Sequence, residues 1–214
     1  MAGNKVFEYR GVEGLVIAPI TSDDNEEGGG YKTGDVLSLC PVAEIGKEVE
    51  ASSEAHYYDN QPLIVIQSEG PDTISITGAG MLLETIALIS GKHFDKTTGA
   101  MIDGPIETRY FALGYKTKAT DGTYRYVWRY KGTFAIPADA HKTEDNGTDA
   151  NGTTLTYTGI YTTHKFTKGK YNGTAWEKAP GKGIIVDEGL GLADLATFFD
   201  TVTTADTLKA KATA

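Results

Sequence analysis

Cysteine and long apolar segments are both scarce in this chain of 214 residues. Cys40 is the single cysteine, so no disulfide can form within the chain, and a reducing compartment is the default expectation. The most apolar segment, Met81 to Ile89, is short and interrupted by Glu84. Residues 1–10 lack the apolar stretch that export signals carry. We therefore expect neither a membrane-spanning helix nor an export signal.

Positive charge is also in deficit. The chain has 20 lysines and arginines against 29 aspartates and glutamates, which gives a formal net charge of −9. Nucleic-acid binding draws its affinity from cationic side chains that neutralise phosphates. The charge balance therefore argues against a protein that grips DNA or RNA.

Motifs for catalysis, metal binding and phosphate binding are missing as well. None of the four histidines stands in a known motif, there is no Gly-x-Ser-x-Gly, and Cys40 lies in an apolar strand where a buried thiol is expected. The acidic run Asp23 to Gly28 resembles a calcium loop, but Gly34 takes the twelfth position, where a glutamate is required. The glycines at 181 and 183 precede a strand, whereas a P-loop opens a helix. The sequence thus predicts no catalytic residue, cofactor or metal, and no enzyme.

What the chain does contain favours β-structure. It has 26 glycines and 12 tyrosines together with abundant threonine, a composition typical of short strands joined by turns. Its length suits one all-β unit with a sizeable core. We predict a single mainly β domain over residues 1–202. Residues 203–214 are rich in Thr, Ala and Lys with little to bury, so they are expected to form a flexible tail.

The clearest local signal is a β-hairpin between Glu107 and Pro137. Two stretches rich in aromatic and β-branched residues flank the turn sequence from Ala119 to Gly122, and Asp-Gly readily takes the positive φ of a tight turn. The second arm alternates with the two-residue period of a strand. One face carries Tyr124, Tyr126, Trp128 and Tyr130, and the other carries Arg125, Val127, Arg129 and Lys131. A free monomer gains little from the cationic face, whereas a subunit packed among copies of itself could use both.

Two helices are expected. Apolar residues recur at three- and four-residue spacing between Gly80 and Ser90, and Gly91 is placed as a C-cap. A similar spacing of Leu192, Leu195, Phe198 and Val202 indicates an amphipathic C-terminal helix. The remaining strands are expected over residues 14–20, 36–42, 63–67, 73–77, 153–166 and 184–186, with a polar, irregular segment over 51–60.

A long acidic, glycine-rich loop spans residues 20–35. A loop of this length is usually functional, and this one could reach a neighbouring subunit and become ordered on contact. The hairpin and the loop carry opposite charges and no obvious partners within the chain. We therefore select candidate subunit-contact residues from both segments: Asp23, Asp24, Glu26, Glu27, Tyr31, Arg125, Arg129 and Lys131.

The order of these features resembles one family. A short helix is followed by a Gly-x-x-Phe/Tyr-Asp-x-x-Thr-Gly-like segment at Gly91–Gly99, then by the hairpin strand Tyr124–Gly132 and a threonine-rich strand. This pattern is similar to the major tail protein, or tail tube protein, of long non-contractile-tailed bacteriophages and prophages of Gram-positive bacteria. The similarity is strongest over residues 80–166 and looser elsewhere.

The resemblance implies a β-sandwich or barrel-like subunit with a flanking helix. Six copies would form a ring, and stacked rings would make a tube around the tape measure protein and, later, the passing genome. Tail tip and tail terminator proteins would be further partners, DNA would be non-specific cargo, and no membrane would be involved. The protein would belong to the virion tail, assembled in the bacterial cytoplasm. Its acidic balance would keep DNA phosphates from adhering to the lumen.

Two other classes stay open from the residues alone. One is a related structural protein, such as a secretion-tube or head–tail connector component, which would need partners to form tubes. The other is a carbohydrate-binding or immunoglobulin-like adhesion module, for which exposed aromatic side chains would be the supporting feature. Glycan binding by a stable monomer would distinguish the adhesion module from a tube subunit.

Overall fold

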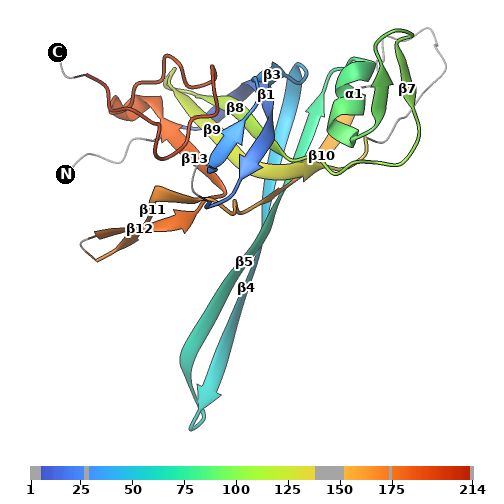
Figure 1. The fold of residues 1–214 in the computed structure, drawn as a ribbon. Helices are drawn as coiled ribbons and strands as arrows, with labels where there is room; N and C mark the ends of the chain where they lie inside the picture. Colours follow the sequence, from blue (N-terminus) through green and yellow to red (C-terminus); the bar gives the residue numbers. More distant parts are fainter. Residues whose placement is uncertain (1–5, 27–28, 138–151, 174, 213–214) are drawn as a thin grey trace, which may run out of the picture.

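One antiparallel β-sheet organises the chain in a computed structural model that describes residues 6–26, 29–137, 152–173 and 175–212 (Figure 1). The fold is mainly β and sandwich-like, as the sequence predicted, and the described residues contain one of the two expected α-helices. The strands of the main sheet are β1 (Tyr9–Asp23), β2 (Tyr31–Thr33), β3 (Leu37–Ser38), β4 (Val42–Tyr58), β5 (Gln61–Gly78), β8 (Phe111–Ala119), β9 (Tyr124–Phe134), β10 (Thr153–Ile160) and β13 (Gly183–Asp187).

Four small units of the described chain lie outside this sheet. The helix α1 (Leu83–Ser90) is followed by the two-stranded ribbon β6 (His93–Asp95) and β7 (Ala100–Ile102). A second two-stranded ribbon consists of β11 (Lys165–Asn172) and β12 (Ala175–Pro180). A 3₁₀ turn, η1 (Glu188–Leu190), follows β13.

The strand order is β2-β1-β8-β9-β10-β5-β4, and β9 is the strand where the sheet divides. Along one edge β9 pairs with β8. Along the other edge its residues 131–134 pair with β10, and its residues 125–129 pair with β13. Two strands, β10 and β13, therefore share one edge of β9 and continue the sheet from different parts of that strand.

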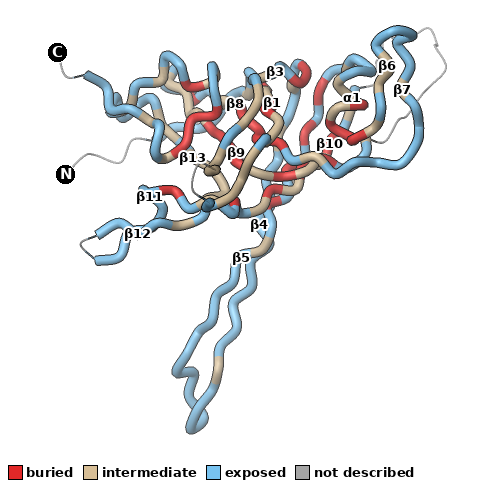
Figure 2. The backbone as a smooth tube through the Cα atoms, viewed as in Figure 1, coloured by how far each residue is buried: buried red, intermediate tan, exposed pale blue. Residues whose placement is uncertain are grey.

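Each face of the sheet is covered by its own apolar cluster. The inner cluster includes Ile17, Ile74, Phe111, Leu155 and Tyr157 and is joined by Ile89 of α1. The outer cluster joins side chains of β1, β8, β9 and β11 to the segment after η1; its buried members are Ala18, Ala112, Trp128, Tyr130, Phe166, Phe198 and Val202. The buried segments in Figure 2 are confined to the body of the molecule.

The predicted helix and hairpin are both confirmed. The helix ends at Gly91, whose φ of 69° is the left-handed conformation of a C-cap glycine. The hairpin β8–β9 turns at residues 120–123, and Gly122 has a φ of 88°. The predicted alternation along β9 is also confirmed, because Trp128 and Tyr130 enter the outer cluster while Val127 enters the inner one. Both faces of β9 are therefore packed within one chain, contrary to the expectation that a monomer would leave its cationic face unused.

The acidic loop expected over residues 20–35 is shorter than predicted. The strand β1 continues to Asp23 and pairs with β2, so Ile20 lies opposite Thr33 and Asp23 opposite Tyr31. The connection between these two strands spans residues 24–30, of which 27 and 28 are outside the described part. The irregular segment expected over residues 51–60 is also wrong, because β4 continues to Tyr58.

The C-terminal prediction is corrected in two respects. Residues 191–212 contain turns and one β-bridge, with no helix, although Leu195, Phe198 and Val202 do pack against the sheet. The first residues of the expected tail are also held in place. Thr203 and Thr204 are buried, the Ala205 amide donates to the Tyr130 hydroxyl at 3.0 Å, and Ala210 bridges to Ala193. Residue 202 is therefore not a boundary between a packed domain and an unpacked tail.

Candidate functional site

The longest element of the fold is a projecting hairpin that we call the arm, residues 42–78, formed by β4 and β5. It extends far from the body, and its outer part is exposed on all sides (Figures 1 and 2). The turn is made by Asp59 and Asn60, with φ values of 48° and 61°, the positive pair that a two-residue hairpin turn requires. No glycine marks this turn, so a hairpin was not predicted here.

The outer half of the arm has no strand partner outside its own hairpin among the residues that the structure describes. The strand β10 pairs with β5 only over residues 72–78, so over residues 51–69 β4 and β5 pair only with each other among the described strands. Leu63, Ile64, Val65 and Ile66 are each between 50% and 65% exposed. Consecutive strand residues point to opposite faces, so both faces of the arm carry aliphatic side chains. Exposed strand edges with apolar faces are the surface that an additional strand would cover.

At its root the arm is tied to the body by a buried carboxylate. Asp72 is 1% exposed and lies 2.9 Å from Lys47 Nζ, 3.1 Å from Lys182 Nζ and 3.5 Å from Arg129 Nη1. Burial acts to raise the pKa of Asp72, but hydrogen bonds from Lys47 and Lys182 outweigh it and hold the pKa below its ordinary value. Lys182 also reaches Glu69 at 2.8 Å, so a single lysine connects two positions of β5 to the body.

The predicted charge match between the hairpin and the acidic loop exists, but within one chain. Lys131 Nζ donates to Asp23 Oδ2 at 2.5 Å. The same carboxylate accepts hydrogen bonds from the amides of Thr163 and His164 at 2.9 and 2.8 Å. Burial acts to raise the pKa of Asp23, but these three donors prevail and lower it. The premise that these segments lack internal partners is therefore wrong.

The two arginines among the candidates also have partners inside the chain. Arg125 forms a two-pronged ion pair with Asp187, at 2.5 Å through Nε and 2.9 Å through Nη2, and its guanidinium lies 4.7 Å from the ring centre of Tyr9. The hydrogen bonds from Arg125 lower the pKa of Asp187. Arg129 is buried and faces Asp72, at the arm root.

The remaining candidates divide into three cases. The Tyr31 hydroxyl donates to the Tyr130 carbonyl at 2.6 Å, and its ring packs on Phe166, so this side chain belongs to the outer cluster. Asp24 closes its own turn, because its carboxylate accepts from Ser22 Oγ and from the amides of residues 26 and 30. Glu26 is exposed, and Glu27 lies outside the described residues.

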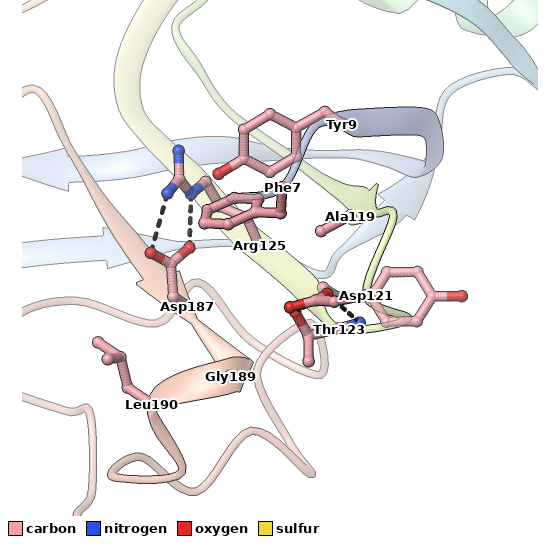
Figure 3. A pocket seen from close by; sticks show the side chains of 10 residues that line it. Phe7, Tyr9, Ala119, Asp121, Thr123, Arg125, Asp187, Gly189 and Leu190 are labelled. Atoms are coloured by element: carbon pink, nitrogen blue, oxygen red, sulfur yellow. Dashed lines mark hydrogen bonds and ion pairs between the residues drawn. The ribbon is translucent and has the colours of Figure 1, made fainter. Parts of the chain in front are cut away.

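Beside the Arg125–Asp187 pair is a pocket of about 170 Å³ (Figure 3). The aromatic rings of Phe7 and Tyr9 and the side chain of Leu190 line it, so its walls are largely apolar. Three charged side chains also line it. Arg125 and Asp187 neutralise each other, and the Asp121 carboxylate accepts hydrogen bonds from the amide and the hydroxyl of Thr123, at 2.9 and 2.6 Å. The residues that line the pocket include no histidine, cysteine or lysine, so its lining gives little support for a catalytic site.

Other chemistry finds little support in the part of the chain that the structure describes. No group of three His, Cys, Asp or Glu side chains is arranged to hold a metal ion. Cys40 is buried, as predicted, and burial raises the pKa of its thiol, so it is a poor nucleophile. No helix among these residues is long and apolar enough to span a bilayer. Comparison with protein-family models and with curated protein sequences finds no match to this chain.

Proposed function

We propose that this protein is a structural subunit that self-assembles through its arm, and that the assembly is the tail tube of a long non-contractile-tailed bacteriophage. In this proposal six copies form a ring, rings stack into a tube, and viral DNA passes through the channel. The tape measure, tail tip and tail terminator proteins are the other partners. The subunit works without catalysis or cofactor, in the virion tail, after assembly in the host cytoplasm.

The observation that carries the proposal is the arm. Its hairpin carries four consecutive half-exposed aliphatic residues, and over residues 51–69 neither outer edge pairs with another described strand. A monomer leaves such a surface in water. Pairing with strands of neighbouring copies satisfies its backbone groups and buries those side chains. Closure of the copies into a ring leaves no free edge, which an open chain of copies cannot achieve.

A second line of support is the sequence pattern together with the fold. The helix-to-hairpin order over residues 80–134 resembles tail tube proteins, and the mainly β fold with one flanking helix is of the kind that the resemblance implies. The net charge of −9 suits a channel that DNA traverses without adhering, since like charges repel.

The test compares assembly of the wild type with an arm variant, Ile64→Lys/Ile66→Lys. Both residues are about half exposed, so the variant is expected to fold normally while losing rings and tubes in negative-stain electron microscopy. The matched control is Ile102→Lys/Ile185→Lys, since these residues of the body are exposed to a similar extent. A wild type that stays monomeric at high concentration and binds glycans would replace the proposal with the adhesion module. If the arm variant formed tubes as well as the wild type, the arm would not be the assembly surface.

A further inference from the structure

Two projections of this molecule carry opposite charge. The arm contains seven carboxylates and one lysine, a formal charge of −6. The ribbon β11–β12, residues 165–180, contains four lysines and one glutamate, a formal charge of +3. Figure 1 shows both hairpins extending from the body. The ribbon is therefore a basic projection on a protein that is acidic as a whole.

The ribbon presents its charges and aromatic rings outward. Its lysines, at positions 165, 168, 170 and 178, are exposed, and none forms an ion pair with a residue that the structure describes. Near its tip Tyr171 and Trp176 lie edge to face at 5.5 Å and are 62% and 64% exposed. Large aromatic side chains left in water on a charged surface are typical of contact sites.

The base of the ribbon is anchored to the body by hydrogen bonds and by a buried aromatic side chain. Phe166 is buried in the outer cluster. The Asp206 carboxylate accepts hydrogen bonds from the amides of Thr167 and Lys168 at 2.9 and 3.1 Å, and Asn25 accepts one from the Lys165 amide. A hairpin held at its base costs less ordering entropy on binding than a free loop does.

The arm has the complementary surface. Five of its carboxylates are exposed and form no ion pair within the described chain: Glu44, Glu48, Glu50, Glu54 and Asp59. Its other two, Glu69 and Asp72, are already occupied at the root by lysines of the body and of β4. The free carboxylates lie on the same hairpin as the exposed aliphatic run, so the arm offers charge and apolar area together.

We infer that the basic ribbon of one copy binds the acidic arm of a second copy, with the ribbon lysines facing the arm carboxylates and Tyr171 and Trp176 covering its aliphatic side chains. This inference rests on the proposed self-assembly and names its contact surfaces. Charge complementarity selects the second copy over nucleic acid as the partner. Four lysines on a chain of net charge −9 would hold phosphates against the field of the whole protein.

The test is a charge exchange between exposed positions. The ribbon variant is Lys168→Glu/Lys170→Glu/Lys178→Glu, and the arm variant is Glu48→Lys/Glu50→Lys/Glu54→Lys. Self-association is measured by sedimentation velocity over a concentration series, with circular dichroism and thermal melting as checks of folding. Each variant alone is expected to weaken association about tenfold or more, because an exposed ion pair contributes up to about fivefold and reversal makes three contacts repulsive.

An equimolar mixture of the two variants is expected to associate, since an acidic ribbon then meets a basic arm. The control for net charge is Lys96→Glu/Lys209→Glu/Lys211→Glu, which reverses three exposed lysines elsewhere and should associate like the wild type. A ribbon variant that associates as well as the wild type, or a mixture that stays monomeric, overturns the inference.

The outcomes separate this inference from the proposed function. Hollow tubes made by the ribbon variant would overturn the arm–ribbon contact and leave the tube function standing. Charge-dependent association into chains that never form rings or tubes would support the contact and count against the tube. A wild type that stays monomeric throughout would overturn both. A last measurement tests binding of a fluorescent single-stranded DNA 20-mer at physiological salt. If the wild type and the arm variant bind it equally and the ribbon variant does not, the partner of the ribbon is nucleic acid and not the arm.

Discussion

Replacing Asp23 by asparagine should destabilise the isolated subunit. The Asp23 side chain is 6% exposed, and its two oxygens accept from Lys131 Nζ, the Thr163 amide and the His164 amide. Asparagine keeps one acceptor oxygen and replaces the other with an NH₂ group. In the less costly orientation its oxygen faces Lys131 and Thr163, and its NH₂ meets the His164 amide donor head-on.

The expected loss follows from those contacts. One hydrogen bond to a charged acceptor is worth about 1.5–3 kcal/mol, and an unsatisfied buried donor costs a similar amount. The weaker attraction of Lys131 to a neutral side chain adds to the loss of stability, whereas small movements of the asparagine NH₂ and the His164 amide away from each other reduce it. We therefore expect Asp23→Asn to lower the free energy of unfolding by about 2–4 kcal/mol. Glu26→Gln, on the exposed side of the same turn, should stay within about 0.5 kcal/mol of the wild type.

Urea unfolding of dilute, monomeric protein provides the measurement, and the loss should not depend on protein concentration. A double-mutant cycle that combines Asp23→Asn with Lys131→Met should show non-additive losses in the free energy of unfolding, because both variants disrupt the same contact. A change below 0.5 kcal/mol in dilute monomer would refute the reasoning. A loss that appeared only in assembled protein would instead return Asp23 to a subunit interface.

The pH dependence of this difference has a defined sign. The pKa of Asp23 is lowered in the folded state, so its contribution is present above the unfolded-state pKa of about 3.9. That contribution is lost as the pH falls through the lower, folded-state pKa. The stability gap between wild type and Asp23→Asn should therefore be constant from about pH 5 to 8 and should narrow in the acid range. Urea midpoints at a series of pH values measure it, and a gap that widened toward low pH would contradict the assignment.

Three further predictions concern the body of the fold. Gly132→Ala should cost at least 1–3 kcal/mol by thermal unfolding, because its Cβ would lie 2.4 Å from a carbonyl oxygen of β10; Gly46→Ala, with open space around it, is the control and should change stability by less than about 0.5 kcal/mol. Leu155→Ala should cost about 2–5 kcal/mol in urea, since this side chain is 1% exposed in the inner cluster, and a smaller loss would show a core that collapses around the gap. Truncation after Val202 should lower the melting temperature by several degrees, because it removes buried Thr203 and the donor to the Tyr130 hydroxyl; an unchanged melting curve would restore the flexible-tail prediction.

The sequence predicted those elements in which a regular side-chain pattern marks the face that packs against the rest of the chain. The hairpin β8–β9 was visible because its aromatic residues alternate and Asp-Gly marks its turn. The helix α1 was visible because its apolar residues keep helical spacing before Gly91. In both cases the side-chain pattern reflects a face that packs within the same chain.

The strands expected over residues 63–67 and 73–77 both lie within β5, but their pairing with β4 into a long hairpin escaped prediction for the opposite reason. Over residues 51–69 the arm has no strand partner beyond its own hairpin in the described part of the chain, and residues 51–60 carry no alternation of apolar and polar side chains to mark a strand. The C-terminal segment misled in another way. Leu195, Phe198 and Val202 keep helical spacing and do reach the outer cluster, but they reach it through turns in a threonine-rich segment with weak helix propensity.

The candidate site was predicted in charge but not in topology. Opposite signs on residues 23–27 and 125–131 correctly indicated an ion pair, and Lys131 with Asp23 forms it. Whether such a pair closes within one chain or between two depends on how strands far apart in sequence are ordered. That order places β1, β9 and the 163–165 segment together, and no local pattern encodes it.

In the proposed assembly, the charge on the arm also bears on how a subunit with such an exposed edge would avoid indiscriminate pairing before it joins a ring. The run from Leu63 to Ile66 is aliphatic, β-branched in three of its four residues and uncharged, which are features of segments that pair indiscriminately. Five free carboxylates on the same hairpin make the approach of two arms repulsive, since each brings a formal charge of −6. An arm that approaches a basic ribbon does not meet that repulsion, so arm-to-ribbon contact is favoured over arm-to-arm pairing.

Raising the salt concentration should therefore weaken the proposed arm-to-ribbon association. It should also increase disordered aggregation, because salt screens the repulsion between arms. Static light scattering would distinguish this aggregation from ring or tube formation. Aggregation that fell with added salt, in step with association, would show that the carboxylates do not protect the arm.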